Sequence, residues 1–359
     1  MPTVLHVLPV DATLSCPGLE DWLSAGAGFT PLFAADQADL FAGRPVLPLP
    51  VGRAPWTRFK PLVRLLPGEA NPWVGFLRDR HVDLVHLHDL THLDALAQAT
   101  DRLDVPLVLS WPRGGSPDAP FERADRILVP TLAQRDRLIE AGCPADRLVV
   151  APVPVAPQPA PARRAPLKGQ PLRWISAALE AETQSLALVL EAFLAYRAAA
   201  DHPSTLRVLT TAHLADEAEG LIAELGLTDV VECGEVTRAA TMRQAFLDAH
   251  LGVFPLEPAE PDVDAGLTWP AWAAAATGLP LVLGPEGATD GFRDGQEALV
   301  ADLEPGSFAR KMHFLSQRPF AWPNLGQQAA QYATTAADFQ QARQVPYQVY
   351  KELLRTASV

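Results

Sequence analysis

A chain of 359 residues is long enough to form two domains that each bury a full hydrophobic core. With 48% hydrophobic and 20% charged residues, it has the composition of a globular protein, and its longest apolar runs fall short of the ~20 residues that a membrane-spanning helix needs. The formal net charge of −13 argues against a general affinity for nucleic acid or anionic lipid.

The N-terminus predicts a buried strand and not a secretion signal. The run from Thr3 to Leu8 is apolar and β-branched, and no basic stretch precedes it. The cysteines are few and far apart, without metal-site spacing: Cys16, Cys143 and Cys233. We therefore expect reduced thiols in a cytoplasmic protein, with no metal and no cofactor.

The segment 42–68 is the one basic island of the chain. It carries five cations, no acid and several interleaved apolar side chains; the cations are Arg44, Arg53, Arg58, Lys60 and Arg64. Two interpretations stay open. Residues 44–66 could make peripheral contact with a membrane surface or an anionic acceptor, or they could form a solvated loop and helix face whose apolar residues pack inward.

Two polar segments follow predicted strands of the N-terminal half. The run 81–88 ends in His88 and Asp89, and because open α/β sheets bind ligands at the carboxyl ends of their strands, these two residues are candidates to line a cleft. The alternation of the strand favours a core position for His86. The strand at 105–110 is followed by Arg113 and two glycines, a weak signal of an anion site.

The remaining N-terminal segment looks like scaffold. Residues 121–155 predict a strand, a helix with Leu132, Leu138 and Ile139 on one face, a terminating Gly142 and a further strand. Proline and alanine then dominate residues 156–171, which we interpret as a semi-stiff linker.

The C-terminal half repeats the alternation of strands and helices. Strands are predicted near 172–175, 206–209, 230–236, 251–254 and 281–283, with helices at 182–199, 214–225, 238–247 and 305–316 between and after them. Apolar strands that alternate with helices indicate a parallel α/β sheet. The stretch 251–282 is one such crossover, whose Ala-rich helix ends at Gly278.

This chain resembles the family 4 glycosyltransferases, which are retaining enzymes. The resemblance rests on Ala276-Thr277-Gly278-Leu279-Pro280-Leu281-Val282, on Asp83, Val85, His86 and His88, and on the pattern over 121–155. It implies the GT-B fold, an α/β architecture of two Rossmann-like parallel-sheet domains that face each other across a cleft. The implied division is an acceptor-side domain at 1–155, the linker at 156–171, a donor-side domain at 172–323, and a helical tail at 324–359 that crosses back onto the first domain.

The same resemblance assigns the donor site. It implies donor contacts by Arg113, by Gly234 and Glu235 after a strand, and by Asp290 in a turn closed by Asp294 and Gly295. The positions of the two family glutamates, however, hold Ala265 and Ala273. The positions of the family arginine and lysine, which neutralise the donor diphosphate, hold Leu179 and Gln184.

Substitutes for these charges are present in the sequence. An acidic loop could replace the glutamates through Glu257, Glu260, Asp262 or Asp264, although a solvated turn is the favoured interpretation of that loop. The lost cations could be replaced by Arg113, Lys168, Arg173 or Arg238. Each missing charge-assisted contact to a diphosphate would cost on the order of 2 kcal/mol.

Three functional interpretations follow. The chain is a family 4 type glycosyltransferase with an altered donor site, which transfers a sugar from UDP- or GDP-sugar to a glycan or lipid-linked acceptor. Alternatively, it is a catalytically inactive relative that acts as a partner of another glycosyltransferase, as a scaffold or as a glycan binder. A different chemistry on the same fold, such as epimerisation of a sugar nucleotide, has no supporting cluster of acids and histidines. The sequence does not decide turnover, and it implies no nucleic-acid partner.

Overall fold

The structure is a computed structural model of the whole chain. It describes residues 1–8, 29–35, 46–50, 71–88, 90, 92–111, 121–130, 132–151, 161, 165–178, 183–236, 239–255, 269–285, 292–336, 342 and 344–356. These residues fall into two compact units. The N-terminal unit comprises Met1–Val153 together with the chain from Gln340 onward, and the C-terminal unit contains the elements between them.

The N-terminal unit is built on a seven-stranded parallel sheet with the order β3-β2-β1-β4-β5-β6-β7. Its strands are β1 (Thr3–Val7), β2 (Thr30–Ala35), β3 (Val46–Pro48), β4 (Leu84–Leu87), β5 (Leu107–Ser110), β6 (Arg126–Val129) and β7 (Leu148–Val150). Its helices are α4 (Pro72–Asp79), α5 (Leu93–Leu103), α6 (Leu132–Glu140) and α15 (Gln344–Thr356).

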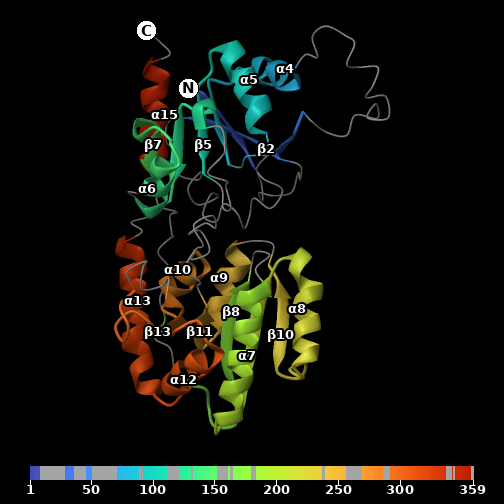
Figure 1. Cartoon of the computed structure of the whole chain (residues 1–359), viewed down its shortest axis with the longest axis vertical. Helices are drawn as coiled ribbons and strands as arrows, with labels where there is room; N and C mark the ends of the chain where they lie inside the picture. Colours follow the sequence, from blue (N-terminus) through green and yellow to red (C-terminus); the bar gives the residue numbers. More distant parts are fainter. Residues whose placement is uncertain are drawn as a thin grey trace. The chain divides into compact units, whose positions relative to one another are not determined.

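Two separate cores cover the two faces of this sheet, because successive strand residues point to opposite sides. Leu5 and Val7 pack on one face with the buried residues of α4 and α5. Val4 and Leu8 pack on the other face, where Tyr347 and Tyr350 of α15 cover them. Figure 1 shows α15, in red, beside the N-terminal sheet. The last helix of the chain therefore completes the core of the unit in which the chain begins.

The C-terminal unit has a six-stranded parallel sheet with the order β10-β9-β8-β11-β12-β13 (Figure 1). Its strands are β8 (Leu172–Ala178), β9 (Ser204–Thr210), β10 (Val231–Glu235), β11 (Leu251–Phe254), β12 (Leu281–Leu283) and β13 (Leu299–Val300). Its helices are α7 (Thr183–Ala199), α8 (Ala212–Glu224), α9 (Ala239–Asp248), α10 (Trp269–Ala276), α12 (Pro305–Ser316) and α13 (Trp322–Ala336).

Both sheets reverse their strand order at one point. In the N-terminal unit the order turns between β1 and β4, and in the C-terminal unit it turns between β8 and β11. Such switch points leave a crevice at the carboxyl ends of the two central strands, where doubly wound proteins bind their ligands. The predicted pair of Rossmann-like parallel-sheet domains is thus confirmed.

The helix before β12 shows how local sequence and packing agree. Helix α10 ends before Gly278, whose φ of +71° is the left-handed conformation that favours glycine at a helix end. Helix α13 packs directly on this turn, and a Cβ atom added to Gly326 would lie 2.2 Å from the carbonyl oxygen of Gly278. The side chains of Trp272, Phe292 and Tyr332 join the same two helices through aromatic contacts.

Some elements differ from the sequence-based expectations. The predicted tail consists of two helices that belong to different units: α13 stays with the C-terminal unit, and the chain from Gln340 onward joins the N-terminal one. Of the three residues predicted to share one face of α6, only Leu138 is buried, whereas Leu132 and Ile139 are 58% and 38% exposed. Among the described elements, α6 makes its main contacts with β6 and β7, and it buries a narrow stripe.

Most of the basic island 42–68, including most of the residues 44–66 considered for membrane contact, lies outside the described residues. Its described part contains β3, a short strand at the edge of the sheet. Within the described part of the chain, no helix combines the length and the apolar character required to cross a membrane.

Candidate functional site

Three histidines gather at the switch point of the N-terminal sheet. His6 lies on β1 and His86 is its register partner on β4. His88 follows β4, where its backbone N–H donates a hydrogen bond to the carbonyl oxygen of Val7 at 3.0 Å. All three side chains occupy the alternating positions that face α15, because Val4 and Leu84 lie two residues before His6 and His86 in the core beneath that helix.

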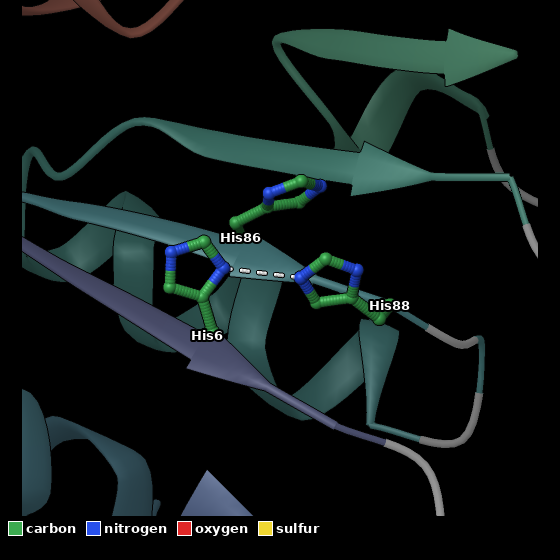
Figure 2. Close-up of side chains that lie close together, drawn as sticks. All are labelled: His6, His86 and His88. Carbon is green, nitrogen blue, oxygen red and sulfur yellow. Dashed lines mark hydrogen bonds between the residues drawn. The ribbon is translucent and has the colours of Figure 1, made fainter. Parts of the chain in front are cut away.

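The ring nitrogens of the three histidines are joined by short contacts to one another and to two hydroxyl groups. His6 Nδ1 lies 3.1 Å from His88 Nε2, and Figure 2 shows these two rings pointing toward each other with the ring of His86 beside them. His86 Nδ1 lies 2.5 Å from the Tyr350 hydroxyl of α15, and His86 Nε2 lies 2.7 Å from the hydroxyl of Ser110 at the end of β5. The cluster thus connects three strands and the last helix.

Burial keeps these imidazoles neutral. The exposed fractions of His6, His86 and His88 are 2%, 0% and 6%. Desolvation lowers the pKa of His88 to about 3 and the pKa values of His6 and His86 well below 6.5, with the neighbouring histidines as a second cause for the latter two. Desolvation also raises the pKa of Tyr350 well above 10. At neutral pH the cluster carries no charge.

The cluster has the donor set of a metal site. Each ring offers one nitrogen, and the three nitrogens lie within 4.8 Å of one another. Neutral imidazole is the form that binds Zn²⁺ and related ions. The sequence argument missed His6 altogether, since it looked for metal ligands by spacing along the chain. A histidine near the end of β1, together with the His-x-His ending of β4, was the available signal.

His88 and Asp89 were expected to line a cleft, and the structure describes only the first of them. His88 is buried and hydrogen-bonded to His6, and His86 is a satisfied core imidazole, as its alternation predicted. Asp89 lies outside the described residues.

The switch point of the C-terminal sheet has a different character. Strand β8 ends in Ala177 and Ala178, and β11 ends in the buried Phe254. The hydroxyl group of Ser185, in the first turn of α7, donates to the carbonyl oxygen of Pro255 at 3.5 Å. Small and apolar side chains therefore line the described part of this strand edge.

Gly234 and Glu235, two of the predicted donor contacts, end β10, the edge strand that is separated from β8 by β9. The side chain of Glu235 is exposed, and a Cβ atom added to Gly234 would lie 3.0 Å from Nε of Arg207 on β9. Glycine at this position therefore lets the Arg207 side chain approach the backbone of β10. Packing against Arg207 is therefore sufficient to explain glycine at position 234.

Among the positions where family members carry charges, Ala273 can be placed with its surroundings. It is 2% exposed on α10, and its neighbours Ala271, Ala274, Ala275 and Ala276 are buried as well. Gln184 lies in the first turn of α7. The other site residues proposed from the sequence lie outside the described residues; they are Leu179, Ala265, Glu257, Glu260, Asp262, Asp264, Arg113, Arg238 and Asp290.

The structure argues against Arg173 as a substitute cation for the donor diphosphate. It is the second residue of β8, about 16 Å of extended strand from Ala178 at ~3.3 Å per residue, and its Nε donates to the carbonyl oxygen of Asp248 at 2.9 Å. Lys168 precedes β8 and is exposed near the same amino end. Ligands of doubly wound sheets bind at the opposite edge.

A cavity of about 350 Å³ lies on that amino side of the C-terminal sheet. Arg173 and Arg207 line it together with three acids, Asp229, Glu232 and Asp248. Because its charges are mixed and it lies near the start of β8, β9 and β10, it does not correspond to the donor position expected from the strand order.

Acidic side chains within the turn that follows the predicted donor residue Asp290 stabilise that turn. Asp294 accepts a hydrogen bond from the backbone N–H of Val300 at 2.8 Å and pairs with Lys311 at 3.1 Å. Gly295 has a φ of +76°, which agrees with the predicted turn. The carboxylate of Glu297 is 5% exposed and pairs with Arg293, which lowers the pKa of Glu297.

Solved structures resemble the chain along its whole length. Anabaena HepE in complex with UDP-glucose is similar with a TM-score of 0.72 and 13% sequence identity over 100% of both chains. Sucrose-phosphate synthase from Thermosynechococcus elongatus has a TM-score of 0.71 and 14% identity over 99% of this chain and 100% of its own. A glycosyltransferase from Rickettsia africae has a TM-score of 0.68 and 12% identity over 98% of each chain.

No protein-family model matches the chain, and no curated protein matches its sequence. The likeness to the solved structures therefore concerns the fold. The chain has the GT-B glycosyltransferase fold, with two Rossmann-like domains built on parallel sheets. This confirms the fold class predicted from the sequence and leaves the narrower family 4 assignment as a proposal.

Proposed function

We propose that the chain is a glycosyltransferase of the family 4 type with an altered donor site. Its reaction would move a sugar from a nucleotide-sugar, with UDP-sugar as the first choice, to a glycan or lipid-linked acceptor. The observation that carries this proposal is the full-length match of both sheets to Anabaena HepE, a protein solved with UDP-glucose. The carboxyl edge of β8 and β11 is the expected donor position, because ligands of doubly wound sheets bind at the switch point.

The altered donor site is part of the same proposal. The position of a family glutamate holds Ala273, whose side chain is buried within an all-apolar helix, and the position of a family lysine holds Gln184. A charged donor site depends on fixed electrostatic groups near the developing charge. Sugar binding here would rely on groups outside the family pattern, with Arg113 and the acidic loop 257–264 as the proposed substitutes.

One observation favours a second candidate, a catalytically inactive relative that serves as the partner of an active transferase or binds a glycan. Because all the alanines of α10 are buried, the side chain of Ala273 belongs to the packing of the unit. An inactive relative would keep the fold but lack the charged residues of the donor site. The two candidates differ in whether the chain binds a nucleotide.

Calorimetric titration of the full chain with UDP, GDP and their common sugars, with and without Mg²⁺, tests the proposal. We expect micromolar binding of one uridine nucleotide. Substitution of Arg113 by alanine should weaken that binding about 10- to 30-fold, the effect of one lost charge-assisted hydrogen bond.

The matched control is Arg102→Ala, which removes an exposed arginine in the last turn of α5. It should leave the binding constant unchanged. No binding of any of these nucleotides up to millimolar concentration would overturn the transferase proposal for these donors and would favour the inactive candidate.

A further inference from the structure

We propose that His6, His86 and His88 form a structural binding site for one divalent transition-metal ion of the Zn²⁺ class. This site lies within the N-terminal unit and is independent of the nucleotide-sugar proposal. Its ligands come from two strands that are 80 residues apart in the sequence but are register partners in the sheet.

The spacing of the rings suits a shared ion. Two imidazole nitrogens bound to tetrahedral Zn²⁺ at ~2.0–2.1 Å lie about 3.4 Å apart. His6 Nδ1 and His88 Nε2 lie 3.1 Å apart, and the third ring is close, since the centroids of His86 and His88 are separated by 4.0 Å. Small rotations of the three rings would direct their lone pairs to a common point between them.

The chemistry of the rings fits the same ion. Imidazole binds such an ion in its neutral form, and the three ring nitrogens lie within 4.8 Å of one another. The donor set is entirely imidazole nitrogen, which suits Zn²⁺ and Co²⁺ better than the hard ions Mg²⁺ and Ca²⁺.

The surroundings of His86 supply the orienting contacts that metal-bound histidines require. A ligand histidine uses one nitrogen for the metal, and its other nitrogen is held by a hydrogen-bonding group. His86 has such a group at each nitrogen, the hydroxyls of Tyr350 and Ser110. When one nitrogen turns to the ion, the other keeps its hydroxyl partner and fixes the plane of the ring.

Burial indicates a structural role. The three side chains are at most 6% exposed, so the site is closed to substrate, whereas catalytic zinc keeps an open position. An ion here would fasten β1 to β4.

Metal loading of the full, untagged chain tests this inference. The protein is stripped with a chelator, dialysed, and loaded with Zn²⁺ or Co²⁺. We expect about one ion per chain by elemental analysis, the visible absorption of tetrahedral Co²⁺, and a higher melting temperature in the loaded form. His6→Ala and His88→Ala should each weaken retention of the ion more than 10-fold.

The matched control is His81→Asn, which removes an exposed histidine of the same unit and places asparagine, which tolerates this conformation, at its positive φ of 50°. It should retain the ion. Because a cluster variant could fail to fold, X-ray absorption of the loaded wild-type protein provides a second test, with about three imidazole ligands expected at ~2.0–2.1 Å.

Less than half an ion per chain, or a spectrum without imidazole ligands, would overturn the inference. Unchanged retention in a folded cluster variant would overturn it as well. None of these outcomes depends on nucleotide binding, so this inference and the proposed function can fail separately.

Discussion

The two sheets share one strand order but present different chemistry at their switch points. In the N-terminal unit the central strands β1 and β4 bring three histidines together under α15, and each ring has a polar contact. In the C-terminal unit the central strands β8 and β11 end in small and apolar residues, and Ala273 on α10 is buried. The polar switch point therefore lies in the unit that we propose as the acceptor side.

This difference teaches that a common scaffold does not determine the chemistry at its edges. The apolar switch point can be packed by the hydrophobic effect alone, without any partner for a polar group. The histidine switch point is stable only while each buried ring keeps a hydrogen bond or a metal. A charge introduced at either switch point should therefore be destabilising, whereas the loss of a polar partner should matter only at the histidine switch point.

The largest effect is expected from Ala273→Glu, which places at an apolar position the residue that the resemblance to family 4 glycosyltransferases implies there. An unpaired carboxylate in this buried helix should lower the free energy of unfolding of the C-terminal unit by about 3 to 5 kcal/mol, the range for an uncompensated buried charge. Urea unfolding measures the change, with Ala223→Glu on an exposed position of α8 as the matched control. If the Ala273→Glu protein is as stable as the wild type and gains sugar transfer, then the site accommodates an acid. The contrast between an apolar and a polar switch point would then be wrong.

Acid should destabilise the N-terminal unit of the chelator-treated protein before the C-terminal one. The pKa values of His6, His86 and His88 are lowered in the folded state, so below pH 6.5 the unfolded chain binds protons that the folded chain does not. Stability is then complete above pH 6.5 and is lost as the pH falls toward 3, by about 1.4 kcal/mol per histidine per pH unit.

Urea unfolding at pH 7.5 and 5.5, combined with hydrogen exchange of peptides from each unit, measures this loss. The exchange rates must first be corrected for their intrinsic pH dependence. His81→Asn is the matched variant, because it removes an exposed histidine of the same unit. Equal stability of the N-terminal unit at both pH values would mean that the folded cluster accepts protons, contrary to its burial.

The smallest effect is expected from Tyr350→Phe, which removes the hydroxyl that contacts His86. The free energy of unfolding of the N-terminal unit should fall by about 1 kcal/mol, the net value of one hydrogen bond. In a His86→Leu background the same change should cost almost nothing, so a double-mutant cycle isolates the bond. An identical cost in both backgrounds would show that the hydroxyl of Tyr350 contributes independently of His86, and the hydrogen bond between them would then not account for the cost.

Much of the fold was predictable because short sequence patterns determine its strands and helices. The apolar strands near Thr3, Leu251 and Leu281, and the helix before Gly278, occur in the structure within a few residues of their predicted bounds. The helix predicted at 305–316 is α12, Pro305–Ser316. These elements combine a strong periodicity with proline or glycine at their ends, and both signals act over a few residues.

Predictions of which surface a helix packs against were less accurate. Leu132 and Ile139 have the character of core residues, but α6 has too few neighbours to bury them. The predicted tail reached from 324 to 359 as one packing unit, yet α13 remains on α10 and α15 packs on the N-terminal sheet. Periodicity shows that a helix has an apolar face and does not show which surface will cover it.

By itself, the sequence determined the class of the fold and the positions of most strands and helices, since these follow from the spacing of apolar residues and from helix ends such as Gly278. Only the tertiary structure brought His6 next to His86 and His88, and only it placed Tyr350 on the same cluster. The reason is physical. Strand order and helix docking join residues that are 80 and 264 positions apart, and no local pattern encodes such pairs.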